Sequence, residues 1–403
     1  MKTLKRILAA TTLLVTLGFA SEANAQVPLE NFFKNPEKAG YQISPDGKYF
    51  SYMAPYENRL NLFVQEVGSD KATRITSETV RDLAGSMWAN GHRILYIKDT
   101  AGDENFQLYG VNVDGTDSKA YTAFPKVRTT IIDPLENIDS LVIIGLNKRN
   151  PQVFDPYRLN LNNGELTQLA ENPGNIQGWM TDHNGKLRVA LAIVDGVNTQ
   201  ILYRETEEQP FRPVLTTNFK ETVSFATFTP DNKMVYALTN IGRDKTALVL
   251  MDPATCEEKE VLYTNDKYDI SGLGYSELKK KLISVSCTGH KGTIRHYFDK
   301  NEEAIRTKLE QKLEGYDINT TSEDKSENIR IIYAGGDRTY GTYYTYNVKE
   351  DKLTKIADLA PWIKEEDMVP MHPITYTSRD GLTIEGYLSL IHISEPTRQA
   401  EIS

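Results

Sequence analysis

The sequence contains little cysteine and no excess of basic residues. Only 2 Cys occur among 403 residues, and the formal net charge is −9. Two cysteines do not make a disulfide framework. The repeat pattern described below places Cys256 and Cys287 at opposite ends of neighbouring units, too far apart for a bridge, so we expect free thiols. The negative charge and the lack of a basic patch argue against a nucleic-acid partner.

Long apolar runs are missing after the N-terminus, which excludes further membrane-spanning segments. The one such run, residues 7–20, follows three basic residues and precedes Ala23-Asn24-Ala25. This order is typical of a secretory signal peptide, and the run is short for a membrane anchor. We therefore expect a signal peptide over residues 1–25, a mature start at Gln26, no integral membrane span after cleavage, and a periplasmic or secreted protein.

Motifs for metals, phosphates and hydrolytic nucleophiles are also absent. None of the 6 histidines has HExxH or HxH spacing, and no cysteine pair lies near one. The sequence has no glycine-rich phosphate loop and no GxSxG elbow. We expect no cofactor, no metal site and no catalytic residue in this chain. The histidines are His92, His183, His290, His296, His372 and His392.

What the sequence does contain is a repeat of about 46 residues. Its anchor is a turn followed by an apolar strand, as in "ISPDGKYFSYMA". The anchors recur at spacings of 44, 46, 48, 47, 46 and 47 residues. Such a period is typical of propeller blades. The seven anchor positions are Gly47, Gly91, Asn137, Gly185, Asn232, Leu278 and Lys325.

A second series of turns runs in phase with the first, at spacings of 47, 49, 43, 47, 47 and 49 residues. Each repeat then holds four short strands with period-two alternation. We predict an all-β, seven-bladed propeller of four-stranded blades over residues 40–358, closed by packing of blades one and seven without strand exchange. The second series is Gly68, Gly115, Gly164, Glu207, Ala254, Asn301 and Glu350.

The remaining segments frame the propeller. Residues 26–39 form a lead-in and residues 359–373 a linker. Only Asn301–Gly315 has a helical pattern, and we place it as an insertion in the sixth unit. Residues 374–387 read as a hairpin, because Asp380-Gly381 is a strong turn signal between two strands.

Two polar clusters are candidates for binding. Asp103, Glu104 and Asn105 could hold a cation or contact another domain, although such residues are also ordinary turn formers, which we favour. Glu205, Glu207 and Glu208 could attract a peptide's amino terminus, but a charge run in an outer hairpin is usually only solvated, and we favour that reading too.

Four stretches resemble the N-terminal part of secreted serine peptidases of the prolyl oligopeptidase family, in particular the dipeptidyl-peptidase and acylaminoacyl-peptidase branch. They are "PLENFFKNPEKAGYQISPDGKYFSYMA", "KDTAGDENFQLYGVN", "GGDRTYGTYYTYN" and "ITYTSRDGLTIEGYL". The resemblance covers residues 27–387. In that family an α/β-hydrolase domain follows the propeller, so residues 374–387 resemble the first hairpin of that domain.

The resemblance implies a peptidase that hydrolyses short peptides, with the propeller restricting access. The family's chemistry uses a serine nucleophile, a histidine base and an orienting aspartate. These lie downstream of the opening hairpin, so no residue of this chain matches a catalytic position, and we expect the chain itself to be inactive. His392 and Ser394 are rejected as triad members because no elbow surrounds them.

The last residues have a different character. "LSLIHISEPTR" resembles the translated read-through of a transposon-type sequencing adapter. We therefore expect residues 388–403 to be non-native and the catalytic domain to be truncated. A natural short C-terminus is the alternative.

Two other functions are alternatives to a peptidase. A free-standing TolB-like propeller would bind a partner without catalysis, but it has no use for the hairpin. A propeller enzyme working through its own channel, such as a lactonase or glycan lyase, would need clustered channel His, Asp and Glu.

Overall fold

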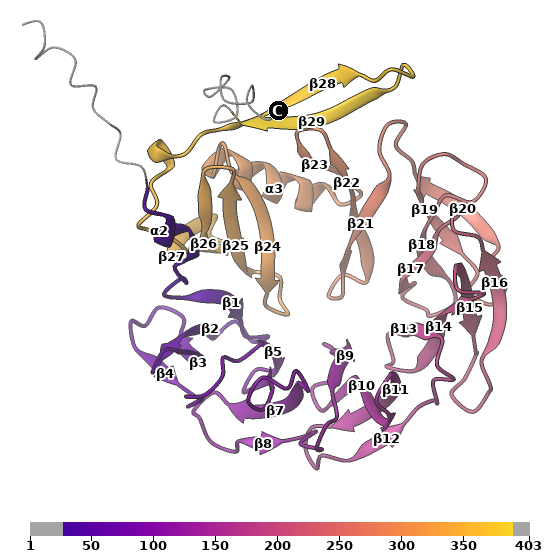
Figure 1. Cartoon of the computed structure of the whole chain (residues 1–403), viewed down its shortest axis with the longest axis horizontal. Coiled ribbons are helices and arrows are strands. Elements are labelled where there is room, and N and C mark those ends of the chain that lie inside the picture. The colour runs from indigo at the N-terminus through magenta and orange to yellow at the C-terminus, as the bar shows by residue number, and fades with distance from the viewer. Residues whose placement is uncertain (1–26, 390–403) are drawn as a thin grey trace, which may run out of the picture.

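A computed structural model describes residues 27–389 of the chain. These residues form seven antiparallel sheets arranged in a ring, followed by a separate two-stranded sheet (Figure 1). A short helix, α2 (Leu29–Phe33), precedes the first sheet. The expected signal peptide, His392, Ser394 and all but the first two residues of the expected non-native tail lie outside the described residues.

The first four blades have four strands each, in sequence order. Blade one contains β1 (Ala39–Ile43), β2 (Tyr49–Tyr56), β3 (Arg59–Glu66) and β4 (Ala72–Arg74). Blade two contains β5 (Gly85–Asn90), β6 (Arg93–Lys98), β7 (Gln107–Asn112) and β8 (Lys119–Ala120). Blade three contains β9 (Thr129–Asp133), β10 (Leu141–Asn150), β11 (Val153–Asn160) and β12 (Leu166–Gln168). Blade four contains β13 (Ile176–Thr181), β14 (Leu187–Val194), β15 (Asn198–Tyr203) and β16 (Arg212–Thr217).

The later elements complete the ring and leave it. Blade five contains β17 (Val223–Phe228), β18 (Val235–Thr239), β19 (Ala247–Met251) and β20 (Glu258–Tyr263). Blade six contains β21 (Ile270–Ser276), β22 (Lys281–Gly289) and β23 (Gly292–Tyr297), followed by helix α3 (Lys300–Lys312). Blade seven contains β24 (Asp317–Glu323), β25 (Ile329–Gly336), β26 (Thr339–Asn347) and β27 (Lys352–Asp358). The 3₁₀ helix η1 (Glu365–Asp367) leads to β28 (Met371–Thr377) and β29 (Thr383–Ser389).

The seven-bladed, all-β fold predicted from the repeat is confirmed. Each anchor position lies between the first and second strands of its blade. The second strands carry the most continuous apolar runs because they are covered on both sides by neighbouring blades. In β10, for example, Val142, Ile143 and Ile144 are fully buried.

Neighbouring blades are held together by apolar seams, and one of them closes the ring. Tyr41 and Ile43 of blade one pack with Ile331 of blade seven in a single buried cluster. The Ile43 N–H donates to the Ser322 hydroxyl at 3.1 Å, and the Lys325 N–H donates to the Pro45 carbonyl at 2.9 Å. No strand of blade one joins the sheet of blade seven within the described chain, so closure occurs by packing without strand exchange.

Blade six corrects one detail of the prediction. Its sheet has three strands, and the helix follows them in place of a fourth strand instead of being inserted into a complete blade. The predicted turn at Asn301 therefore lies inside α3. The segment is rich in helix formers, and the Asp299 side chain caps it by accepting from the N–H groups of Asn301 and Glu302. Leu309 and Leu313 then pack on blade seven.

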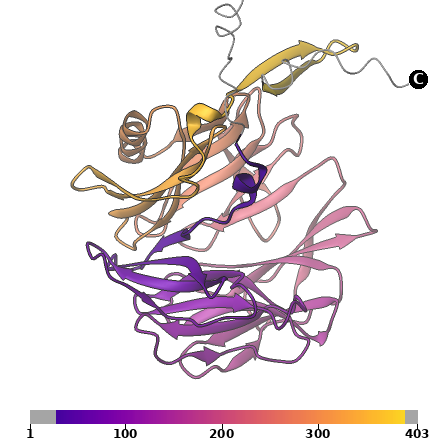
Figure 2. The same ribbon diagram turned by 60° about the vertical axis from the view of Figure 1, so that its left-hand side comes forward.

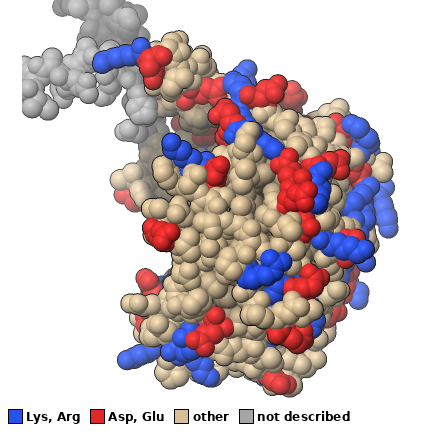
Figure 3. Space-filling view, turned by 90° about the vertical axis from the view of Figure 1, so that its right-hand side faces the viewer, with Lys and Arg blue, Asp and Glu red and all other residues tan. Residues whose placement is uncertain are grey.

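The outer surface is mixed in charge. Figure 2 shows α3 beside the strands of blade seven. On the face in Figure 3, side chains of both signs are interspersed, beside a broad area with few charges. No helix among residues 27–389 is long and apolar enough to cross a bilayer.

Candidate functional site

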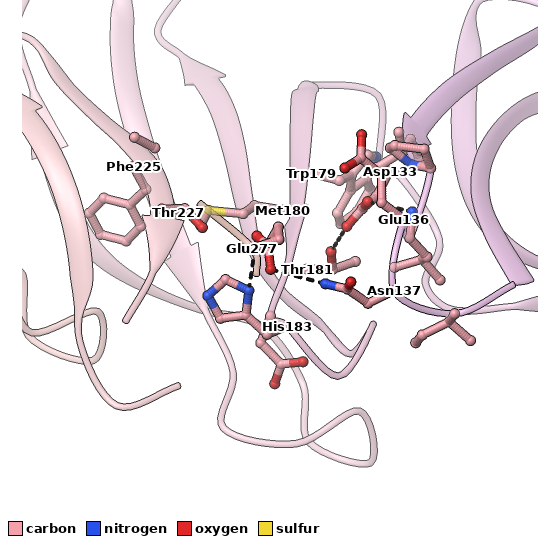
Figure 4. Close-up of a pocket in the computed structure, with 16 residues that line it drawn as sticks. Asp133, Glu136, Asn137, Trp179, Met180, Thr181, His183, Phe225, Thr227 and Glu277 are labelled. Carbon is pink, nitrogen blue, oxygen red and sulfur yellow. Dashed lines mark hydrogen bonds and ion pairs between the residues drawn. The ribbon is translucent and has the colours of Figure 1, made fainter. Parts of the chain in front are cut away.

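Two cavities lie in the interior of the ring. The smaller, of about 450 Å³, is lined by the ends of β9, β13 and β17 together with Glu277 (Figure 4). The larger, of about 1030 Å³, is lined by β1, β5, the strands of blade six, α3 and β24. The loop Pro134–Ser140, called the blade-three loop below, borders both.

The larger cavity exists because blade six has small side chains on the face that meets it. Gly272 pairs with Ser286 and Gly274 with Ser284 across β21 and β22, and all four line the cavity. A Cβ atom on Gly272 would lie 2.4 Å from the Ser286 hydroxyl oxygen. Larger side chains at these four positions would take up part of this space.

The smaller cavity has an acidic wall. Asp133, Glu136 and Glu277 all line it. Desolvation against the wall, together with the negative charges of Glu277 and Asp133, raises the pKa of Glu136. The Thr181 hydroxyl donates to Asp133, and Asn137 and His183 contact Glu277 (Figure 4). The wall thus has a negative potential, but two of its carboxylates are already engaged by the protein.

His183 is the histidine nearest to this wall, and its contacts are structural. Its Nε2 lies 2.9 Å from the Phe228 carbonyl oxygen, and its Nδ1 lies 3.5 Å from a Glu277 oxygen. The ring also stacks on Tyr275. In neither cavity is a Ser or Thr hydroxyl hydrogen-bonded to a histidine ring, so a nucleophile with its base is not assembled there.

The first polar cluster flagged in the sequence forms a turn. Asp103 Oδ1 accepts hydrogen bonds from the N–H groups of Thr100 and Asn105, at 3.2 and 3.1 Å. These bonds close the loop between β6 and β7 on itself. Within the described residues, no group of three or more His, Cys, Asp or Glu is placed to hold a metal ion.

The second cluster, in blade four, is tied up in ion pairs. Glu207 lies 2.8 Å from Arg158 and also accepts the Leu187 N–H at 3.1 Å. Glu205 contacts Arg188 at 3.1 Å. Burial opposes ionisation of Glu207, but the Leu187 and Arg158 hydrogen bonds outweigh it and hold its pKa below the usual range. These carboxylates stabilise the blade.

The hairpin expected from the Asp-Gly turn is present and contacts blade six. Gly381 has φ +87°, a conformation that glycine adopts without strain. On β29, Glu385 lies 2.5 Å from Lys267 and accepts from the Tyr268 hydroxyl at 3.2 Å. The Tyr387 hydroxyl donates to the His290 carbonyl at 2.9 Å. The hydrogen bond from Lys267 holds the pKa of Glu385 below its usual range.

Both cysteines are free thiols, as predicted. Cys256 lies in the turn between β19 and β20, and Cys287 lies on β22 of the next blade.

Sequence reasoning missed the contacts that cross the ring. Asn137 and Lys325 were recognised only as turn positions, yet their side chains reach residues of distant blades. One signal was available. The blade-three loop is the longest of the seven connections between first and second strands.

Comparisons with known proteins agree with this architecture, although no family model matches the chain. The chain is 29% identical over 370 residues to dipeptidyl aminopeptidase BIII of Pseudoxanthomonas mexicana. This alignment covers 89% of this chain and 52% of that protein. It is 26% identical over 402 residues to dipeptidyl peptidase family member 6 of Caenorhabditis elegans, and this alignment covers 94% of this chain and 53% of that protein. The chain thus spans about half the length of these curated relatives.

Solved structures share the fold. A prolyl endopeptidase matches with a TM-score of 0.61 at 12% identity, over 88% of this chain and 54% of that one. Prolyl oligopeptidase B of Galerina marginata matches with a TM-score of 0.59 at 12% identity, over 89% of this chain and 56% of that one. The chain is thus similar in sequence to two dipeptidyl peptidases and shares its fold with part of two prolyl peptidases, which is consistent with the propeller portion of a prolyl oligopeptidase family member.

Proposed function

We propose that this chain is the N-terminal propeller portion of an exported serine peptidase of the prolyl oligopeptidase family. The complete protein hydrolyses short peptides, as a dipeptidyl, acylaminoacyl or prolyl peptidase. Its catalytic triad lies in an α/β-hydrolase domain that follows Tyr387, and its propeller restricts which substrates reach that domain. No cofactor takes part.

One observation carries the proposal. After the seventh blade closes the ring, the chain continues into a hairpin that the ring does not need, and this hairpin is anchored to blade six through Glu385 and Tyr387. β28 is exposed along its whole length. A two-stranded sheet is marginally stable alone and requires further strands or helices. The half-length coverage of two dipeptidyl peptidases supports the same reading.

The chemistry of the proposed catalytic domain is acyl transfer. A serine in a GxSxG elbow would attack the scissile carbonyl after giving its proton to a histidine, and an aspartate would orient that histidine. The propeller contributes no group to these steps. Its role is to define the space in front of the nucleophile.

Export is proposed from the N-terminal pattern alone. A basic start, an apolar core and Ala23-Asn24-Ala25 are the parts of a cleavable signal. The mature protein would begin at Gln26, and N-terminal sequencing of the protein from a periplasmic or culture fraction would test this.

The proposal is tested by recovering the DNA downstream of the codon for Tyr387. We expect an in-frame continuation of roughly 200–270 residues, the scale of one further domain. It should encode a GxSxG followed by Asp and then His. The complete protein should cleave a chromogenic dipeptide substrate, and a serine-directed inhibitor should abolish this activity. A native stop codon near Tyr387 would instead favour the free-standing binding protein.

A further inference from the structure

The face of blade six that borders the larger cavity carries little bulk. Its three strands place opposite residues in two rows, and opposite residues of antiparallel strands project from the same face of a sheet. All six residues line the cavity. The face is therefore a floor of glycine and serine, bordered along β23 by an arginine and a tyrosine. The first row is Gly272, Ser286 and Arg295, and the second row is Gly274, Ser284 and Tyr297.

The opposite wall of this cavity is formed by α3 and blade seven. The helix contacts β23 and packs on blade seven through Leu309 and Leu313 (Figure 1). Arg306 of α3 is fixed by an ion pair with Glu310 at 2.7 Å and donates to the Ile318 carbonyl at 2.7 Å. Among residues 27–389, no buried apolar cluster contains strands of both blade six and blade seven. The seam between these two blades is therefore polar and hollow.

Arg295 is a half-buried cation without a carboxylate partner. Its guanidinium makes one long hydrogen bond, to the side-chain oxygen of Asn319 at 3.4 Å, and no ion pair within the described chain. Burial and then the positive charge of Arg306 lower the pKa of Arg295. A buried charge is unfavourable unless it is paired. An anion beside Arg295 would supply the missing counter-charge.

Three hydroxyl groups border the same space. Those of Ser284, Ser286 and Tyr297 have no hydrogen-bond partner among residues 27–389. A Cβ atom on Gly272 would lie 2.4 Å from the Ser286 oxygen, and one on Gly274 would lie 2.6 Å from the Ser284 oxygen. The two glycines therefore leave the serine hydroxyls uncovered. Together with the guanidinium, these groups form a set of hydrogen-bond donors that lacks an acceptor.

The other charges of the cavity favour a ligand with a single negative charge. Glu302 and Glu323 are each paired with Arg330, and Glu327 is paired with Lys279. Arg295 is left as one unpaired cation, and a dianion would add a second negative charge near these carboxylates. The arginine fork matches the two oxygens of a carboxylate. The cavity, of about 1030 Å³, has room for the body of a small molecule.

We propose that the cavity between blade six and blade seven binds the carboxylate of a small organic acid, with Arg295 as the charged partner. Ser284, Ser286 and Tyr297 donate hydrogen bonds to the same group. The bound acid joins two blades that share no apolar cluster, so it stabilises the folded chain. Binding at this site does not depend on the proposed peptidase activity, and the 403-residue chain is sufficient to test it.

The first test compares an acid with its uncharged analogue. Titration calorimetry of the 403-residue chain with N-acetyl-leucine should give a Kd on the order of 1 mM, which is ordinary for so small a ligand. N-acetyl-leucine amide should bind at least about tenfold more weakly, because it lacks the charge. The acid, but not the amide, should raise the melting temperature. Equal affinities for the two compounds would overturn the carboxylate site, and tighter binding of inorganic phosphate would overturn the preference for a single charge.

The second test locates the site. Arg295→Gln keeps a side-chain amide but removes the charge, and the affinity for N-acetyl-leucine should fall at least about tenfold. Arg212→Gln makes the same change at an exposed arginine of blade four outside the cavity, and it should leave the affinity unchanged. Circular dichroism checks that each variant is folded. Unchanged affinity in folded Arg295→Gln would overturn the assignment to this seam.

A further variant removes a hydroxyl without altering the charge. Ser286→Val should weaken the binding of N-acetyl-leucine several-fold, because one of the proposed donors is lost and the methyl groups occupy part of the floor. This variant decides the location of the site if Arg295→Gln does not fold. Wild-type affinity in Ser286→Val would then show that the acid binds elsewhere.

Discussion

At the scale of single residues, Asp299 links the stability of blade six to pH. Its carboxylate caps α3 and lies 2.7 Å from Lys281. The hydrogen bond from Lys281 outweighs desolvation and lowers the pKa of Asp299 from 3.8 to about 2. A carboxyl group whose pKa is lower in the folded state stabilises the fold above its unfolded pKa. That contribution is lost as the pH falls from about 4 to about 2.

We therefore expect Asp299→Asn to flatten the dependence of unfolding free energy on pH between about 4 and 2. Asparagine keeps a side-chain oxygen for the helix cap, so the substitution removes mainly the charge. Urea unfolding followed by circular dichroism at a series of pH values measures this. Equal slopes for wild type and variant would show that Asp299 is not the group responsible.

The two thiols provide a second test at this scale. Burial raises the pKa of Cys256 to about 12 and also raises that of Cys287. Because the thiolate is the reactive form, both should react slowly with a thiol reagent at pH 8 in the native protein. In denaturant without reductant, two thiols per chain should be titrated. A titre of zero would mean that a disulfide had formed.

At the scale of elements, α3 is held to blade seven by a buried ion pair. Arg330 and Glu302 meet in two hydrogen bonds, at 2.8 and 3.0 Å, and both side chains are less than 10% exposed. Removing one partner of a buried pair costs about 3–5 kcal/mol when the other charge is left uncompensated. Without Arg330, Glu302 keeps an ion pair with Lys279 at 2.7 Å, so its charge stays partly compensated. Arg330→Ala should therefore lower the free energy of unfolding by up to about 3 kcal/mol, measured by urea denaturation.

Lys308 on the outer side of α3 gives the matched comparison. Its side chain is 53% exposed and lies 3.7 Å from Asp351. Lys308→Ala should change the unfolding free energy by no more than about 0.5 kcal/mol. If the two variants were equally stable, α3 would not be anchored through Arg330.

We expect the hairpin to lower the solubility of the chain. It offers two strand edges that no other strand of the described chain covers. Such edges promote association between molecules. Deleting residues 372–403 should increase the soluble yield and leave the β signal in circular dichroism unchanged, because every blade remains. A loss of β signal after deletion would show that the Glu385 contacts are needed for blade six to fold.

The elements also show how far the sequence determines the fold. Turn positions and period-two strands predicted the blades, because each turn and strand is a local feature. The role of α3 was not predicted. A helix and a fourth strand can both cover the outer side of blade six, and only the packing of Leu309 and Leu313 on blade seven distinguishes them. The sequence pattern identified the helix but could not decide what it replaced.

At the scale of the whole molecule, two contacts across the ring show a second limit on what the sequence predicts. Asn137 contacts Glu277, 140 positions away, and Lys325 contacts Asp139, 186 positions away. The repeat period predicts which residues occupy equivalent turns. Whether two such turns meet depends on the curvature of the ring and on loop length, which no local pattern encodes. The apolar contacts between neighbouring blades could be predicted, because the alternation of apolar residues along each strand already marks the faces that must be buried.

The activity of the 403-residue chain tests whether the proposed catalytic residues lie outside it. The ring has its own closure and its own apolar seams, so the 403-residue chain should fold as a β-rich protein. It should hydrolyse no peptide substrate above background. Members of a catalytic triad act as a unit, and neither cavity assembles a hydroxyl with a histidine base. The measurement is hydrolysis of chromogenic dipeptide substrates by purified protein, with a serine-directed inhibitor as control. Inhibitor-sensitive activity in this chain would place the nucleophile within the propeller and overturn the assignment of catalysis to a following domain.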